Sequence, residues 1–198
     1  GFTPIRHIGV KQTFMLTPAP PYDTDPADTG LYNKYFERVE STDDADFALV
    51  FIESPLSDPY HKSDLDNGGN GYLPITLQYR PYTAHKAREV SIAGGDFREK
   101  STNRSYKGKT NCAANENDLD LVINARKAMG DKPVIVVVRM HNSAVLAELE
   151  PYADAIICEF GVQQQAIFDI ISGKVQPSGL LPIQLPADMD TVETHCED

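Results

Sequence analysis

The sequence has little positive charge and no long apolar run. Its 198 residues include 18 Lys and Arg against 29 Asp and Glu, which gives a formal net charge of −11. A chain this acidic repels phosphate backbones and anionic lipid surfaces. Its longest apolar runs, 47–52 and 133–138, fall far short of the roughly 20 residues that a membrane helix requires. We therefore expect neither a nucleic acid nor a membrane among its partners.

Thiols and metal-ligand patterns are scarce as well. The cysteines Cys112, Cys158 and Cys196 form no CxxC motif and have no histidine at ligand spacing beside them. Structural zinc and a disulfide framework are therefore not expected. The histidines are dispersed, and no Gly-x-Ser-x-Gly motif is present, which argues against the commonest hydrolase elbow. We expect no metal and no cofactor.

The sequence does contain three apolar runs rich in β-branched residues, at 47–52, 134–138 and 154–158. The runs are continuous instead of alternating, which is typical of strands buried on both faces of a parallel sheet. Such strands need helices on the faces of the sheet.

Three segments have helical signals. Residues 115–130 combine an Asn cap, acidic residues in the first turn and a terminal Gly130, whereas 142–150 is a short helix-compatible stretch. Residues 163–172 have an apolar side and end at Gly173. The order of helices and strands predicts an α/β fold, a three-layer α/β/α sandwich with a mostly parallel sheet and a long loop insertion.

Two parts of the chain do not fit this alternation. Residues 1–40, rich in proline, are predicted to form an N-terminal arm or linker, in which residues 34–39 could add a short strand or helix, and 41–198 the main domain. Residues 54–112 form a long loop that follows the strand ending at Glu53. Ligands of open parallel sheets bind outside the carboxyl ends of the strands, so we expect the chemistry here.

Several segments resemble, in order, the C-terminal domain of glycoside hydrolase family 3, which includes β-glucosidases and β-xylosidases. They are ADFALVFIESP at 45–55, KPVIVVV at 132–138, YADAII at 152–157, and IFDIISG with PSGLLP within 167–182. Three departures stand out. MHNS at 140–143 lacks the Arg of the family's usual sGrP turn. FGVQQQ at 160–165 replaces the usual PGqEgG, and 72–110 is a large insertion, which suggests a divergent branch with an elaborated active-site loop.

The resemblance implies a β-glucosidase-like enzyme that hydrolyses terminal β-linked sugars with retention. In the family an N-terminal barrel supplies an Asp nucleophile, and the C-terminal domain lends a Glu as general acid/base. We accordingly expect a fragment of a longer enzyme, inactive alone, whose partners are a carbohydrate substrate and the barrel. The resemblance also implies a periplasmic or secreted location. The sugar, the linkage and the oligomeric state stay open.

The candidates for the acid/base are Glu89, Asp58 and Glu53, with Glu99 as an alternative to Glu89. Counting from the Glu-x-Pro motif indicates Asp58, whereas alignment on Asn-Arg-Ser at 103–105 brings Glu89 or Glu99 into reach. Glu89 and Asp58 rank equally, and Glu53 is third because a polar residue at a strand end can also serve the backbone of the loop. A resting acid needs a raised pKa, which pairing with Arg88 would oppose at Glu89.

Arg88, Arg104 and Tyr72 are candidate sugar-binding residues, because guanidinium groups bind hydroxyls and aromatic faces cover sugar rings. A solvated charged loop that packs on itself is the competing interpretation. Two other functions remain open. One is a non-catalytic carbohydrate-binding or interaction module. The other is a flavodoxin-like nucleotide binder, although the Gly-rich segment 68–71 lacks the Lys-Ser/Thr of a phosphate loop.

Overall fold

The structure, a computed structural model, describes residues 3–6, 31, 33–92 and 101–195. Its contacts divide the chain into two compact units, which are described separately. Unit 1 comprises Gly1–Ser54, Asn117–Ser143 and Ala147–Gln184, and unit 2 comprises Pro55–Glu116, Ala144–Leu146 and Leu185–Asp198. No helix among the described residues has both the length and the apolar character needed to cross a membrane.

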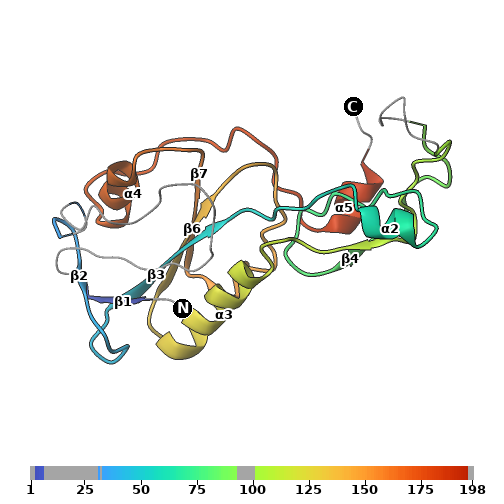
Figure 1. Cartoon of the computed structure of the whole chain (residues 1–198). Coiled ribbons are helices and arrows are strands. Elements are labelled where there is room, and N and C mark those ends of the chain that lie inside the picture. Colours follow the sequence, from blue (N-terminus) through green and yellow to red (C-terminus); the bar gives the residue numbers. More distant parts are fainter. Residues whose placement is uncertain (1–2, 7–30, 32, 93–100, 196–198) are drawn as a thin grey trace. The chain divides into compact units, whose positions relative to one another are not determined.

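Unit 1 is built on a five-stranded sheet with the strand order β2-β1-β3-β6-β7 (Figure 1). The strands are β1 (Thr3–Arg6), β2 (Glu37–Arg38), β3 (Phe47–Glu53), β6 (Val134–Arg139) and β7 (Ala155–Glu159). β3, β6 and β7 are parallel, whereas β1 is antiparallel to both β2 and β3. The three apolar runs are confirmed as parallel strands. The N-terminal arm adds the two antiparallel strands to the sheet.

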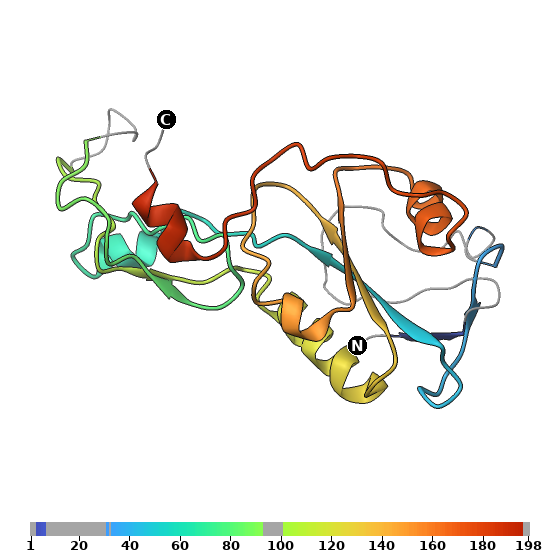
Figure 2. The same ribbon diagram turned by 180° about the vertical axis from the view of Figure 1, so that it is seen from behind.

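Helices cover both faces of this sheet, as Figures 1 and 2 show. They are α3 (Asn117–Met129) and α4 (Gln164–Ile171), with a short 3-10 helix η1 (Glu150–Tyr152). Phe47 and Leu49 pack in the cluster that contains the α4 residues. Ala48 and Val50, which point the other way, are fully buried on the side of α3. The predicted α/β class with helices on both faces of a mostly parallel sheet is confirmed.

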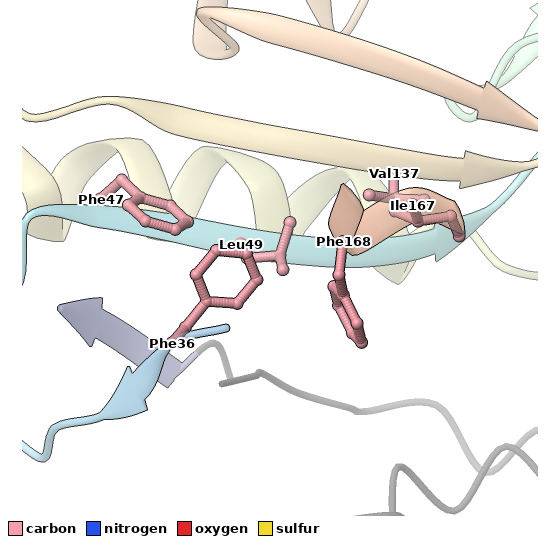
Figure 3. Close-up of a cluster of buried hydrophobic side chains, with 6 residues drawn as sticks. All are labelled: Phe36, Phe47, Leu49, Val137, Ile167 and Phe168. Carbon is pink, nitrogen blue, oxygen red and sulfur yellow. The ribbon is translucent and has the colours of Figure 1, made fainter. Parts of the chain in front are cut away.

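The core between the sheet and α4 is aromatic (Figure 3). It comprises Phe36, Phe47, Leu49, Val137, Ile167 and Phe168. The ring of Phe36 meets those of Phe47 and Phe168 edge to face, with centroids 5.6 and 5.7 Å away. Edge-to-face pairs are favourable beyond the area that they bury. Phe168, fully buried, anchors α4 to the sheet.

The predicted helix at 142–150 is wrong. Between β6 and β7 the structure has only the single turn of η1. Ala144, Val145 and Leu146 are buried, and the Val145 N–H donates to the Leu77 carbonyl at 2.8 Å within unit 2. A backbone N–H used in this way is not available for a helical bond to the residue four positions earlier.

Asp154 joins three elements of unit 1. Its Oδ2 accepts from the Val134 N–H at 2.7 Å and from the Arg126 guanidinium. The backbone hydrogen bond from Val134, followed by the hydrogen bond and charge of Arg126, lowers the pKa of Asp154. These contacts hold the start of β6 beside the last turns of α3.

Asp154→Asn should therefore destabilise the chain at neutral pH but not in strong acid. A carboxyl whose pKa is lower in the folded state contributes stability above its unfolded value, and the contribution is lost as the pH falls through the folded value. Urea unfolding of wild type and variant between pH 7 and pH 2 tests this, with exposed Asp131→Asn as control. A pH-independent difference would contradict it.

Unit 2 contains the long segment predicted as a loop, and that segment has its own small elements. They are α2 (Lys62–Asp66), β4 (Tyr82–Thr83), β5 (Thr110–Asn111) and α5 (Met189–Thr194), with β4 antiparallel to β5. Tyr79 is fully buried. The amide of buried Asn111 donates to the carbonyls of Asp58 and Pro74 at 3.0 and 2.8 Å. The segment thus has its own core and buried hydrogen bonds.

Candidate functional site

Charged side chains line the carboxyl ends of the three parallel strands of unit 1. Glu53, Arg139 and Glu159 are register partners on β3, β6 and β7, and partners of equal register project from the same face of a sheet. Arg139 Nε lies 3.7 Å from Glu159 Oε1. Glu159 Oε2 also accepts from the N–H groups of Gly161 and Val162. Arg139, on the middle strand, therefore has a register partner with a carboxylate on each neighbouring strand.

Glu53 is held from two sides within unit 1. Its Oε2 contacts Nε2 of His141, and its backbone N–H donates to Oδ2 of buried Asp118 at 3.1 Å. The side chains of Glu53 and His141 are 18% and 30% exposed. A mostly buried carboxylate beside an imidazole has the composition of a proton-transfer pair.

Buried Ser54 connects the loops that leave β3 and β6. Its Oγ accepts from the His141 N–H at 3.0 Å and donates to Asn142 Oδ1 at 3.1 Å, and its N–H donates to the Arg139 carbonyl at 2.8 Å. The backbones on either side of the Glu53–His141 contact are thus tied together. These hydrogen bonds therefore fix the position of the Glu53 side chain relative to that of His141.

Glu89 lies on the surface of unit 2, with its side chain 81% exposed. Its Oε1 accepts from Lys107 Nζ at 2.6 Å, and this hydrogen bond and the lysine charge lower the pKa of Glu89. Lys107, 18 residues further on, takes the role that the sequence analysis considered for Arg88. Glu89 is accordingly ionised at neutral pH in the structure.

The segments that contain Arg88 and Arg104 run side by side in unit 2. The Arg104 N–H donates to the Ser91 carbonyl at 2.7 Å, and its guanidinium donates to the Ile92 carbonyl at 3.0 Å. The Arg88 carbonyl accepts from Ser105 Oγ, and its side chain is exposed. The structure therefore brings Glu89, Arg88 and Arg104 into one region.

Asp58 and Tyr72 have local roles in unit 2. Asp58 is exposed, and its Oδ1 accepts from the Tyr60 N–H at 2.9 Å, which stabilises a turn. The half-buried Tyr72 packs edge to face on Tyr60, with centroids 5.5 Å apart. This is the packing that the sequence analysis weighed against a sugar platform.

The Gly-rich segment 68–71 is organised around a carboxylate of this chain. Asp64 Oδ2 accepts from Lys109 Nζ at 2.5 Å and from the Gly71 N–H at 2.8 Å. Lys109 also donates to Asn70 Oδ1 at 2.5 Å. Burial raises the pKa of Asp64, but the hydrogen bonds from Lys109 and Gly71 outweigh it, and the pKa is lowered. The ionised Asp64 thus orders this segment.

The described part of the chain offers neither a metal-binding cluster nor a reactive cysteine thiolate. It contains no group of three or more His, Cys, Asp or Glu side chains placed to hold a metal ion. Burial, followed by the hydrogen bond to Glu116, raises the pKa of Cys112 to about 11, and burial raises the pKa of Cys158. Both thiols are therefore protonated at neutral pH.

Sequence reasoning missed His141, Arg139, Glu159 and Lys107. Arg139 and Glu159 follow predicted strands as Glu53 does, so an alignment of the strand ends would have found them. His141 lies in the segment 140–143 that departs from the family pattern, but that departure suggested no role for it, and Lys107 has no comparable local signal. Glu99, the alternative to Glu89, lies outside the described residues.

Comparisons with known proteins agree with the resemblance. Residues 31–197 match the family model described as Glycosyl hydrolase family 3 C-terminal domain. Curated relatives include Beta-glucosidase C of Emericella nidulans, 35% identical over 72 residues, and Probable beta-glucosidase C of Aspergillus flavus, 36% identical over 66 residues. A Putative beta-xylosidase of Formosa agariphila is 37% identical over 81 residues.

The matched segments cover 36%, 33% and 38% of this chain but only 12%, 10% and 10% of those relatives. The chain thus aligns with about a tenth of their length. No solved structure gives a significant match. The family match nevertheless spans most of the chain, from residue 31 to residue 197. The chain belongs to the glycosyl hydrolase family 3 C-terminal domain family.

Proposed function

We propose that this chain is the C-terminal domain of a β-glucosidase-like enzyme that hydrolyses terminal β-linked sugars with retention. It lends a general acid/base to a barrel domain of the same protein, which supplies the nucleophile. The family match over 31–197 carries the proposal, and the local similarity to β-glucosidases supports it. Without the nucleophile the chain is inactive. A periplasmic or secreted location is proposed on the resemblance alone.

Retention requires two carboxyl groups about 5–5.5 Å apart across the glycosidic bond. In the first step the protonated carboxyl gives its proton to the glycosidic oxygen as the bond to the anomeric carbon breaks, and the nucleophile bonds to that carbon. In the second step the same group, now ionised, takes a proton from water as the water oxygen displaces the nucleophile. Both steps need a carboxyl that gains and loses a proton near neutral pH.

Glu89, Asp58 and Glu53 remain the three candidates for this carboxyl. Glu89 and Asp58 are exposed, and Glu89 is held ionised by Lys107. For Glu89 to serve as the resting acid, substrate or another domain would have to displace Lys107. Glu53 is mostly shielded and lies beside His141 at the carboxyl end of β3.

The test uses the full-length protein that contains this chain, with Glu89→Gln, Asp58→Asn and Glu53→Gln. The variant that lacks the acid should lose about 10²–10⁴-fold in kcat/KM on a β-glucoside with a poor leaving group. It should lose far less on dinitrophenyl β-glucoside, whose leaving group departs without a proton. Exposed Glu150→Gln is the control.

Failure of the full-length protein to hydrolyse any β-glucoside or β-xyloside would contradict the proposal. Isothermal titration of glucose and cellobiose into the 198-residue chain then examines the alternative. Sugar binding without hydrolysis by the full-length protein would favour a carbohydrate-binding module. An active full-length protein in which none of the three variants shows the leaving-group dependence would place the acid/base elsewhere.

A further inference from the structure

We propose that Glu53 is the acid/base and that His141 is its positioning residue, holding the Glu53 carboxylate and stabilising its ionised form. The inference rests on the proposed function and deepens it by assigning the proton-transfer residue and its partner. It is carried by the Glu53–His141 contact at the ends of β3 and β6. His141 is outside the set of residues that the sequence predicted.

The contact is fixed by hydrogen bonds on both strands. On the Glu53 side, Asp118 in the first turn of α3 accepts from the Glu53 N–H at 3.1 Å. On the His141 side, the backbone N–H donates at 3.0 Å to Ser54, the residue that follows Glu53. Ser54 and Asp118 are 0% and 1% exposed. Such a buried frame holds two side chains in a defined geometry before substrate binds.

The carboxylate of Glu53 is therefore unlike those of the other two candidates. Asp58 accepts from a backbone N–H in its own turn, and Glu89 pairs with a flexible lysine at the surface. Glu53 instead has an imidazole partner with restricted freedom, because the loop that carries it is tied to the strand ends. An imidazole can hold or release a proton near neutral pH, whereas a lysine stays charged.

Among the described residues, other ionisable groups lie on the elements next to Glu53. Arg139 projects from β6, Glu159 from β7, and Asp118 from α3. Arg139 interacts with Glu159, and Asp118 is engaged with the Glu53 backbone. The imidazole of His141 contacts the Glu53 side chain directly, at Oε2.

In the proposed reaction Glu53 transfers the proton and His141 does not. With Oε2 against His141, Oε1 is the oxygen that gives its proton to the glycosidic oxygen and later takes one from water. The Nε2–H of His141 donates to Oε2 when Glu53 is ionised, so it stabilises the charge that develops as the proton leaves.

The test is the pH profile of kcat/KM for a poor-leaving-group β-glucoside in the full-length protein. His141→Phe should move the alkaline limb upward by about one to two pH units, because a hydrogen bond to a charged group is lost. His141→Gln, which keeps an N–H donor, should retain most of the original limb. Exposed His85→Phe should leave the limb in place. A purely structural role of His141 would lower activity without moving it.

A second readout is independent of activity. Nitrogen NMR of the 198-residue chain reports which imidazole nitrogen carries the proton, and His141→Phe assigns the signals of that residue. With ionised Glu53 the proton should sit on Nε2. Glu53→Ala should change the His141 signals and leave those of His85 unchanged. Thermal melting of each variant shows that the fold is retained.

The outcomes separate the two proposals. Any of three results overturns this inference. The alkaline limb of the pH profile does not move in His141→Phe, or the NMR signals of His141 do not respond to Glu53→Ala. The third is a leaving-group effect confined to Glu89→Gln or Asp58→Asn. In each case an active enzyme leaves the proposed function standing. If the full-length protein hydrolyses no β-glycoside, both proposals fall. A shifted limb together with a leaving-group effect at Glu53→Gln supports both.

Discussion

Phe168→Ala should lower the free energy of unfolding by about 3–5 kcal/mol. Phe168 is fully buried and lies near Phe36 in the cluster of Figure 3. Its ring centroid is 5.7, 6.4 and 5.7 Å from those of Phe36, Phe51 and Tyr35. Alanine would lose these contacts and leave a cavity. Because the ring joins α4 to the sheet, the loss affects one whole face of unit 1.

Urea unfolding followed by circular dichroism measures this effect, since the chain has no tryptophan to report by fluorescence. The matched control is Phe160→Ala. Phe160 is 43% exposed, so the same change of side chain should cost well under half as much. Equal losses in the two variants would show that the aromatic cluster is not the core of unit 1.

Gly69→Ala is expected to destabilise the chain by about 1–3 kcal/mol, the usual range for an overpacked site. A Cβ at position 69 would overlap the Asp64 carboxylate, much closer than van der Waals contact allows. Asp64 cannot turn away without losing its hydrogen bonds from Lys109 and the Gly71 N–H. The substitution therefore forces either a steric clash or the loss of a charge pair that is about four-fifths shielded.

A double-mutant cycle with Asp64→Ala identifies the cause. In the Asp64→Ala background the cost of Gly69→Ala should largely disappear, because the clashing group is absent. Gly179→Ala serves as control, since a Cβ there meets nothing within 4 Å. Additive effects in the cycle would mean that the glycine is needed for another reason. All of these proteins can be compared by urea midpoint at one pH.

The elements that the sequence predicted correctly are those with strong local patterns. The runs at 47–52 and 134–138 became β3 and β6, and the capped segment 115–130 became α3. The segment 142–150 is also compatible with a helix, but the hydrogen bond between Val145 and Leu77 decides its conformation. The two residues are far apart in sequence, so no local pattern reveals their contact.

In the candidate site, too, local sequence predicts some features and contacts between distant residues determine the others. Glu53 could be located from its place at the end of a strand, because that edge is where parallel sheets bind ligands. Its contact with His141 depends on the register between β3 and β6, which hydrophobic runs do not specify. Similarly, Arg88 was expected to pair with Glu89 because the two are neighbours in the sequence. In the folded loop the partner is Lys107, 18 residues further on.

The way in which the chain alternates between the two units determines what proteolysis or truncation would produce. The backbone passes from one unit to the other after residues 54, 116, 143, 146 and 184. A protease that nicks any one loop would therefore produce two fragments of which at least one contains parts of both units. Neither unit could be expressed by simple truncation at one end, since each is assembled from separated stretches of sequence. Gene fusions or recombination events that transfer this region intact must carry it as a single block.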